Sequence, residues 1–303
     1  MSTGADSVKS IIYALTANFA IAVAKMGAAV TTGSGAMLAE SIHSFADCGN
    51  QLLLLLGLRS AKKAPSLDHP LGYGKSIYFW SFIVAIMLFS MGGLFSIYEG
   101  VHKLDSTEPL NQPLNQPLIA LGILVFAIVA EGLSLMGCIK EVNKERDGRS
   151  FWRWFQETRQ SELLVIFGED LAALFGLVFA LAAVSLAMVT GNPIYDAVGS
   201  IGIGVLLIII AIFIGIEIKA LIIGQGVEPK TLASMKRFLA DQEEVEEVYN
   251  LLTLQMGSDA MVAVKAKMTS NSTAQILITD INKTEVKLKA AYPKGLWLFS
   301  SPT

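Results

Sequence analysis

The sequence predicts an all-α polytopic membrane domain of six transmembrane helices, followed by a small α+β domain. The chain has 303 residues, of which 53% are hydrophobic and 16% charged, so it is far more apolar than a soluble domain. Six apolar runs are each long enough to cross a bilayer as a helix. From about Val227 the composition changes to that of a soluble domain. We therefore expect a membrane domain at residues 1–226 and an αββαβ domain at residues 227–303.

The membrane domain is predicted from the apolar runs and from the charges between them. Basic residues gather in the loops after the second and fourth runs, whereas the TGSGA and TGNP connections carry no charge. By the positive-inside rule, this alternation places both basic loops and both termini in the cytoplasm. Neither a signal-peptide cleavage site nor an Arg-rich transit segment is recognisable, so we expect a prokaryotic cytoplasmic membrane. The runs are Ile11 to Val30, Met37 to Leu58, Ile77 to Val101, Leu118 to Ile139, Leu163 to Val189 and Ile194 to Ile223.

The segment GRSFWRWFQETR, residues 148–159, interleaves aromatic and basic residues. Beside a membrane span, this mixture is typical of a short helix that lies at the level of the lipid headgroups. The same residue types can stack on bases, but the net charge of −3 does not favour a nucleic-acid partner. We expect the lipid bilayer as a partner and no nucleic acid.

The last part of the chain has alternating helical and strand patterns. Helical apolar spacing follows Pro229, and in residues 261–268, MVAVKAKM, the apolar side chains oppose two lysines as in a strand. Residues 247–257 supply a hairpin partner, residues 273–292 a second helix and residues 295–299 a last strand. This order predicts a small αβ sandwich. It contains neither His nor Cys, and so is poorly equipped to bind zinc tightly.

Two candidate metal ligands, His43 and Asp47, interrupt the apolar run from Ala39 to Arg59. On a helix, their i, i+4 spacing puts both side chains on one face, one turn apart. Imidazole nitrogen and carboxylate oxygen are both zinc ligands, and a second helix would have to complete a tetrahedral site. Ionisable residues at membrane depth are costly and normally mark an ion pathway. The alternative is a hydrogen bond between the two side chains that only locks helices together.

Three more carboxylates lie in later spans. Glu169 and Asp170 are neighbours in the fifth run, so only one of them can face the second helix. Asp170 is the better candidate, because small residues follow it. Glu169 could be a further ligand, accept the exchanged proton or pair with a basic residue. Glu131 could relay protons, supply an additional carboxylate ligand or form a helix-helix hydrogen bond. Lys25 in the first run is expected to pair with a carboxylate.

The loop after the second run, SLDHPLGYGKS, holds Asp68 and His69 next to each other. They could form a weak loop metal site or cap the following helix. The two cysteines, Cys48 and Cys138, lie far apart in separate runs and are expected to be packing residues rather than ligands.

Several motifs together resemble the cation diffusion facilitator family of divalent-metal/proton antiporters. They are KMGAAVTTGSGAMLAESIHSFAD across the first two runs, DHPLGYGK, YDAVGSIGIG and the tail that begins with VEP. The elements ESIHSFADCGNQ, SFWRWFQETR, GED and GNPIYD resemble the branch that includes the mitochondrial zinc transporter. The resemblance implies a six-span protomer with a cytoplasmic ferredoxin-like domain, assembled as a homodimer. It also implies metal export from the cytoplasm by alternating access, driven by inward protons.

Within this resemblance, His43 and Asp47 match the metal-binding HxxxD of the second span, and Asp170 matches the Asp of the fifth. The family's usual His falls on Ile166 here, so Glu169, Glu131 or a water would have to complete the site. In the loop motif His69 matches, but a second His is replaced by Tyr73.

These observations predict a Zn2+/proton antiporter that has no permanent cofactor and treats the metal as substrate. His43 favours zinc over manganese or magnesium. The missing fifth-span His leaves iron, cobalt, nickel and manganese as alternative substrates. A non-transporting scaffold or regulatory partner with the same fold is the alternative from another class. An enzyme is not expected, because no Ser/His, Cys/His or HExxH constellation is present.

Overall fold

The computed structural model describes residues 4–105, 117–192, 194–270, 273–293 and 296–302. The chain forms two compact units. The first contains Met1–Leu56, Trp80–Arg149 and Glu162–Glu217, and the second contains Gly57–Phe79, Ser150–Ser161 and Ile218–Thr303.

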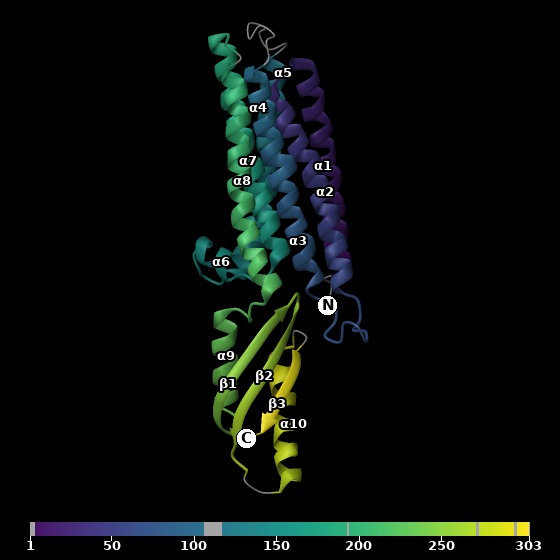
Figure 1. Cartoon of the computed structure of the whole chain (residues 1–303), viewed down its shortest axis with the longest axis vertical. Helices are drawn as coiled ribbons and strands as arrows, with labels where there is room; N and C mark the ends of the chain where they lie inside the picture. Colours follow the sequence, from purple (N-terminus) through teal and green to yellow (C-terminus); the bar gives the residue numbers. More distant parts are fainter. Residues whose placement is uncertain (1–3, 106–116, 193, 271–272, 294–295, 303) are drawn as a thin grey trace. The chain divides into compact units, whose positions relative to one another are not determined.

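Long helices make up most of the first unit. Five of the predicted apolar runs each lie inside one helix, and the third lies inside the continuous helical stretch Ser76–Asp105. Figure 1 shows α1, α2, α5, α7 and α8 running lengthwise along one another. Among the described residues, four helical stretches are long and apolar enough to cross a membrane: Ser76–Asp105, Leu121–Glu145, Ser161–Thr190 and Ile194–Ile223. The helices are α1 (Gly4–Thr32), α2 (Gly35–Ala61), α3 (Ser76–Met87), α4 (Phe95–Asp105), α5 (Pro117–Glu145), α7 (Ser161–Thr190) and α8 (Ile194–Ile223).

The tight connection between α1 and α2 follows from its sequence, TGSG. Gly33 has a positive φ of 69°, and its N–H donates to the carbonyl of Ala29, so it terminates α1 as glycine commonly does. Ser34 then accepts a hydrogen bond from the N–H of Met37 at 3.2 Å. A serine oxygen in this position caps the start of a helix, so α2 begins at once.

A π-helical segment, η1 (Leu88–Leu94), joins α3 to α4. It contains Gly92 and Gly93, both buried. A Cβ added at Gly93 would lie 3.2 Å from the carbonyl oxygen of Gly204 in α8, and one at Gly204 would lie 2.6 Å from that of Gly93. The paired glycines therefore let the two backbones approach closely, as small residues do between membrane helices.

The second unit contains the predicted αββαβ order. Its elements are α9 (Pro229–Ala240), β1 (Val245–Met256), β2 (Asp259–Met268), α10 (Ala274–Ala291) and β3 (Leu296–Pro302). The sheet has the order β1-β2-β3, with β1 antiparallel and β3 parallel to β2. Val262 and Met235 pack in its core together with Val227 and Ala260. The order of elements expected from the apolar patterns is thus confirmed.

The aromatic and basic segment forms the short helix α6 (Phe151–Glu157), which also belongs to the second unit. The Ser150 hydroxyl caps it by accepting from the N–H of Arg153. Just beyond α6, the Arg159 guanidinium donates to the carbonyl of Gly226 at 2.8 Å. This bond ties the loop before α7 to the segment between α8 and α9.

Candidate metal centre

His43 and Asp47 lie one turn apart on α2, as their spacing predicts. The distance from His43 Nε2 to Asp47 Oδ2 is 3.6 Å. His43 is fully buried, and Asp47 is 8% exposed. A separation of 3.6 Å is too long for a hydrogen bond, so the side chains do not lock each other in place.

The same separation suits two ligands of one ion. Zinc binds imidazole nitrogen and carboxylate oxygen at about 2.1 Å, and two ligands at the tetrahedral angle are then about 3.4 Å apart. Both ring nitrogens of His43 and the Oδ1 of Asp47 are buried with no hydrogen-bond partner among the described residues. Buried polar atoms are nearly always partnered, so unpartnered ones side by side call for a ligand or water.

On α7 the two neighbouring carboxylates turn to different helices. Glu169 Oε1 accepts a hydrogen bond of 2.5 Å from Asn50 Nδ2 of α2, whereas Asp170 Oδ2 accepts one of 3.2 Å from Ser134 Oγ of α5. In this structure Glu169, and not Asp170, is hydrogen-bonded to the second helix, so the role of Asp170 as the carboxylate that faces α2 stays a prediction. The rotation of α7 about its axis decides which of the two carboxylates contacts α2. An almost uniformly apolar helix gives no sequence signal for this rotation.

Carboxylates of two other helices, α5 and α7, lie near this part of α2. Asp47 lies within electrostatic range of Glu169, Glu131 and Asp170. Glu131, on α5, is also buried. Among the residues that the structure describes, however, no group of three or more His, Cys, Asp and Glu side chains is close enough to hold one metal ion. The structure thus brings His43 and Asp47 together and leaves Glu169 and Asp170 bonded to Asn50 and Ser134.

A buried ion pair lies one turn before this pair on α2. The ammonium of Lys25 in α1 is 3.3 Å from Glu40 Oε2 and donates to Ser44 Oγ at 2.7 Å. The expected pairing of Lys25 with a carboxylate is confirmed, but the motifs did not single out Glu40. A sequence signal for it existed, because Glu40, His43, Asp47 and Asn50 follow each other at i, i+3, i+7 and i+10 along one face of the helix.

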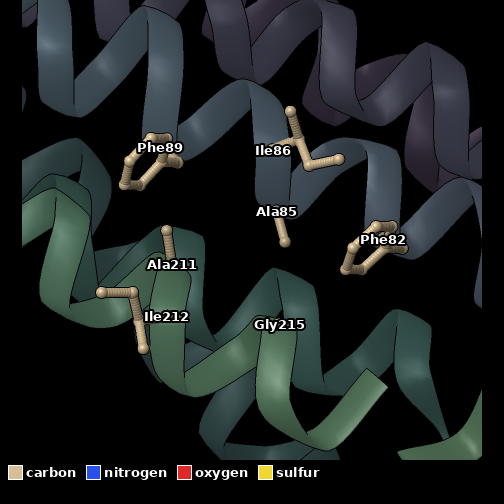
Figure 2. Close-up of a pocket in the computed structure, with 7 residues that line it drawn as sticks. All are labelled: Phe82, Ala85, Ile86, Phe89, Ala211, Ile212 and Gly215. Atoms are coloured by element: carbon tan, nitrogen blue, oxygen red, sulfur yellow. The ribbon is translucent and has the colours of Figure 1, made fainter. Parts of the chain in front are cut away.

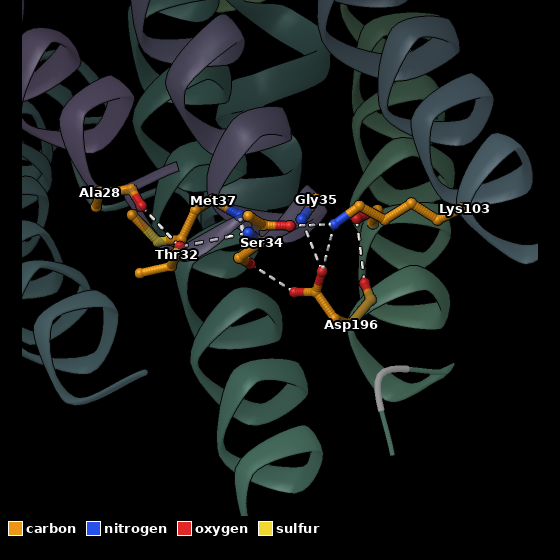
Figure 3. A network of polar contacts seen from close by, with 9 residues as sticks. Ala28, Thr32, Ser34, Gly35, Met37, Lys103 and Asp196 are labelled. Carbon is orange, nitrogen blue, oxygen red and sulfur yellow. Dashed lines mark hydrogen bonds and ion pairs between the residues drawn. The ribbon is translucent and has the colours of Figure 1, made fainter. Parts of the chain in front are cut away.

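A second polar cluster, which we call the Asp196 network, lies at the end of the bundle that holds the α1–α2 turn. Asp196 Oδ1 accepts from Ser34 Oγ at 2.6 Å, and its Oδ2 accepts from the N–H of Gly35 at 2.6 Å and from Lys103 Nζ at 3.2 Å. Figure 3 shows these bonds converging on one carboxylate from the α1–α2 turn and from α4. Lys103 Nζ also donates to the carbonyl of Gly33. Both oxygens of Asp196 are therefore partnered.

Neither the Asp68–His69 loop nor the pocket beside α8 offers a buried set of metal ligands like His43 and Asp47. Asp68 and His69 are exposed, and the His69 ring stacks on Tyr73 with centroids 4.3 Å apart. Figure 2 shows a pocket between the α3–η1 region and α8 that only apolar residues line, so it offers nothing to a cation. These residues are Phe82, Ala85, Ile86, Phe89, Ala211, Ile212 and Gly215.

Comparison with known proteins identifies the class. Residues 11–222 match the cation efflux transmembrane domain family, so the chain belongs to this family of integral membrane transporters, which are not enzymes. The family handles its metal as substrate and not as a permanent cofactor.

The chain is similar to named proteins of an animal, a plant and a bacterium. The chain is 34% identical over 251 residues to the Xenopus laevis protein named proton-coupled zinc antiporter SLC30A9, mitochondrial, with 82% of this chain and 44% of that protein covered. It is 33% identical over 247 residues to metal tolerance protein C4 of Arabidopsis thaliana, with 80% and 53% covered. Magnetosome protein MamB of Paramagnetospirillum magneticum is 25% identical over 295 residues, with 96% and 92% covered. The chain spans about half the length of the first two relatives.

Proposed function

We propose that this protein is a divalent metal cation/proton antiporter, with Zn2+ as its substrate, that exports metal from the cytoplasm by alternating access. The observation that carries the proposal is the buried His43–Asp47 pair. Its Nε2 and Oδ2 are 3.6 Å apart, which suits two ligands of one tetrahedral ion, and both ring nitrogens lack a hydrogen-bond partner among the described residues. Family membership supports transport of a metal cation, and the printed name of the Xenopus relative supports zinc and proton coupling.

The proposed metal site uses His43 and Asp47 from α2 and Asp170 and Glu169 from α7. In this structure, Glu169 is bonded to Asn50 and Asp170 to Ser134. A bound ion would draw one or both carboxylates from these amide and hydroxyl partners. Glu131 remains the candidate for relaying a proton or adding a ligand, because it lies in electrostatic range of Asp47. The proposal also includes a loop metal site at Asp68 and His69, whose side chains are both exposed.

The proposed exchange follows from a competition between metal and protons. Metal binding requires a neutral imidazole and ionised carboxylates, so protons and metal exclude each other from the same side chains. On the more acidic side of the membrane, protons displace the metal. On the other side, the protons leave and the metal binds again. Alternating exposure of one site to the two sides therefore couples the two fluxes.

The architecture completes the proposal. The helices α1 and α2 have 29 and 27 residues, and at about 1.5 Å per residue each exceeds the roughly 30 Å bilayer core. They would bring the number of spans to six, with both termini in the cytoplasm. We place the transport domain at residues 1–226 and a cytoplasmic ferredoxin-like domain at residues 227–303, supported by its αββαβ order. A homodimer in a prokaryotic cytoplasmic membrane is the proposed assembly.

The experiment is zinc uptake into proteoliposomes under an imposed pH gradient. Wild type should show gradient-driven flux, and Asp47→Asn and Asp170→Asn should abolish it. Glu141→Gln is the matched control, because this carboxylate is 58% exposed at the end of α5 and lies outside the proposed site. It should transport like wild type.

Each result has a definite reading. Flux lost in both variants and kept in the control supports antiport through a site shared by α2 and α7. Uptake of manganese, iron, cobalt or nickel but not zinc changes the substrate. A well-folded wild type that moves none of these ions contradicts the proposal and favours a non-transporting partner.

A further inference from the structure

The pair of Lys25 and Glu40 is unusual because both side chains are fully buried inside an apolar bundle. Lys25 belongs to α1 and Glu40 to α2, and they meet with Nζ and Oε2 3.3 Å apart. Ser44 Oγ accepts a second hydrogen bond from the ammonium at 2.7 Å. A charge in this position is costly on its own, so the pair persists because each member compensates the other.

Glu40 occupies the same face of α2 as the proposed metal ligands. It precedes His43 by three residues and Asp47 by seven, which places the three side chains in one row. Its second oxygen, Oε1, is buried with no hydrogen-bond partner among the described residues. A Cβ added at Gly176 of α7 would collide with this oxygen, so Glu40 lies directly against the α7 backbone. A carboxylate oxygen without a partner is thus held near the metal pair but tethered to Lys25.

The positive charge of Lys25 also acts electrostatically on the His43–Asp47 pair. It lies within electrostatic range of His43, Asp47 and Glu131, in addition to Glu40. At membrane depth, water screens such interactions poorly, so a fixed positive charge there is sensed by any cation that enters.

We propose that Lys25 and Glu40 form a built-in counter-cation pair that determines which metal ion the His43–Asp47 site accepts. Lys25 holds the Glu40 carboxylate out of the ion's coordination sphere, and Glu40 in turn neutralises the charge of Lys25. The inference deepens the proposed function and rests on it.

The expected direction follows from ligand chemistry. A site of imidazole and few carboxylates suits Zn2+, whereas added carboxylate oxygens suit Mn2+. If Lys25 no longer holds Glu40, this carboxylate can join the site and improve manganese binding relative to zinc. If Glu40 is neutral, Lys25 is uncompensated and repels every divalent cation.

The test is equilibrium binding of Zn2+ and Mn2+ to the full-length protein in detergent, with thermal unfolding as the check on folding. Lys25→Met should shift the ratio of the two affinities toward manganese by about tenfold, within the range that outer-shell changes produce. Glu40→Gln should weaken both ions by a similar factor and keep the ratio. The double variant, Lys25→Met with Glu40→Gln, should restore the wild-type ratio. The exposed Lys140→Met is the matched control and should bind like wild type.

Two results overturn the inference while wild type still binds zinc. One is a folded Lys25→Met with the wild-type ratio, and the other is an altered ratio that persists in the double variant. If Lys25→Met does not fold, the affinities of Glu40→Gln and of the double variant are compared. The double variant should bind both ions about tenfold more tightly than Glu40→Gln, because it lacks the uncompensated charge of Lys25. Equal affinities of Glu40→Gln and the double variant would also overturn the inference. A wild type that binds neither ion overturns zinc as the substrate in the proposed function.

Discussion

The His43–Asp47 pair and the Asp196 network are both buried and polar, yet they differ in how their atoms are partnered. Asp196 accepts hydrogen bonds on both oxygens, from Ser34, from the N–H of Gly35 and from Lys103. At His43 and Asp47, both ring nitrogens and one carboxylate oxygen have no partner in the described part of the chain. A fully partnered carboxylate fixes helices, whereas an unpartnered one is ready for a ligand.

The contrast shows that burial alone does not identify a functional site. In the sequence, Asp47 and Asp196 are both acidic residues in an apolar run. The difference lies in the supply of donors, because the α1–α2 turn and the end of α4 bring three of them to Asp196. The variants below separate the two roles, since each should change one property and leave the other intact.

The largest effect is expected for His43→Leu. The substitution removes a proposed ligand, so zinc affinity should fall by about 100-fold or more, beyond the effect of losing an outer-shell partner. The thermal midpoint should stay the same or rise, because a buried group without hydrogen bonds is replaced by an apolar one of similar size. Isothermal titration with Zn2+ and a thermal melt check both. His102→Leu, at an exposed histidine, is the control. Unchanged affinity would remove His43 from the site.

A smaller effect of the opposite kind is expected for Asp196→Asn. One carboxylate oxygen becomes an amide that cannot accept from Gly35 or Lys103, so the free energy of unfolding should fall by about 2 kcal/mol. Zinc affinity should not change. The thermal midpoint of the variant is compared with that of Asp241→Asn, which makes the same chemical change at an exposed position. A variant that melts like this control but loses zinc binding would reverse the two roles.

The smallest effect is expected at an exposed pair in the second unit. Lys287 Nζ donates to both oxygens of Glu244 at 2.8 Å, which lowers the pKa of Glu244. A carboxylate whose pKa is lowered by folding stabilises the folded state at every pH above its ordinary pKa. This contribution is lost as the pH falls through the lowered pKa. Lys287→Met should therefore cost roughly 0.5 kcal/mol at neutral pH.

The pH dependence provides the check on that pair. Thermal midpoints of wild type and Lys287→Met should converge as the pH falls from the ordinary Glu pKa of about 4.3 through the lowered pKa of wild type, because Glu244 is then protonated in both. A difference that stays constant over the whole range would show that the lost methylene packing, and not the charge, is responsible.

Much of the fold could be predicted from the sequence, because the signals were strong and local. Apolar runs located every long helix, and the change of composition near Val227 preceded the αββαβ elements. The π-helical segment Leu88–Leu94 was not foreseen. In a run that is apolar on all sides, one extra residue per turn leaves no trace in the pattern of hydrophobicity.

The candidate site was predictable to the extent that it depends on spacing within one helix. The i, i+4 rule brought His43 and Asp47 together, and the cost of a buried charge predicted a partner for Lys25. The contacts between helices depend on how each helix is rotated, which the sequence of α7 does not encode locally. For this reason Glu169 rather than Asp170 meets Asn50, and the complete ligand set stays a prediction.

The π-helical segment also sets the phase of the helix that follows it. A π turn holds one residue more than an α turn, so α4 is rotated by about 100° from the direction that an unbroken α-helix would give it. With this rotation Gly100 lies against Ala197 and Ile201 of α8, and Lys103 reaches Asp196. Deleting one residue between Leu88 and Leu94 would leave a regular helix of nearly the same composition. It would also turn Gly100 and Lys103 away from α8. The contacts of α4 with α8 therefore depend more on the number of residues between Leu88 and Leu94 than on their identity.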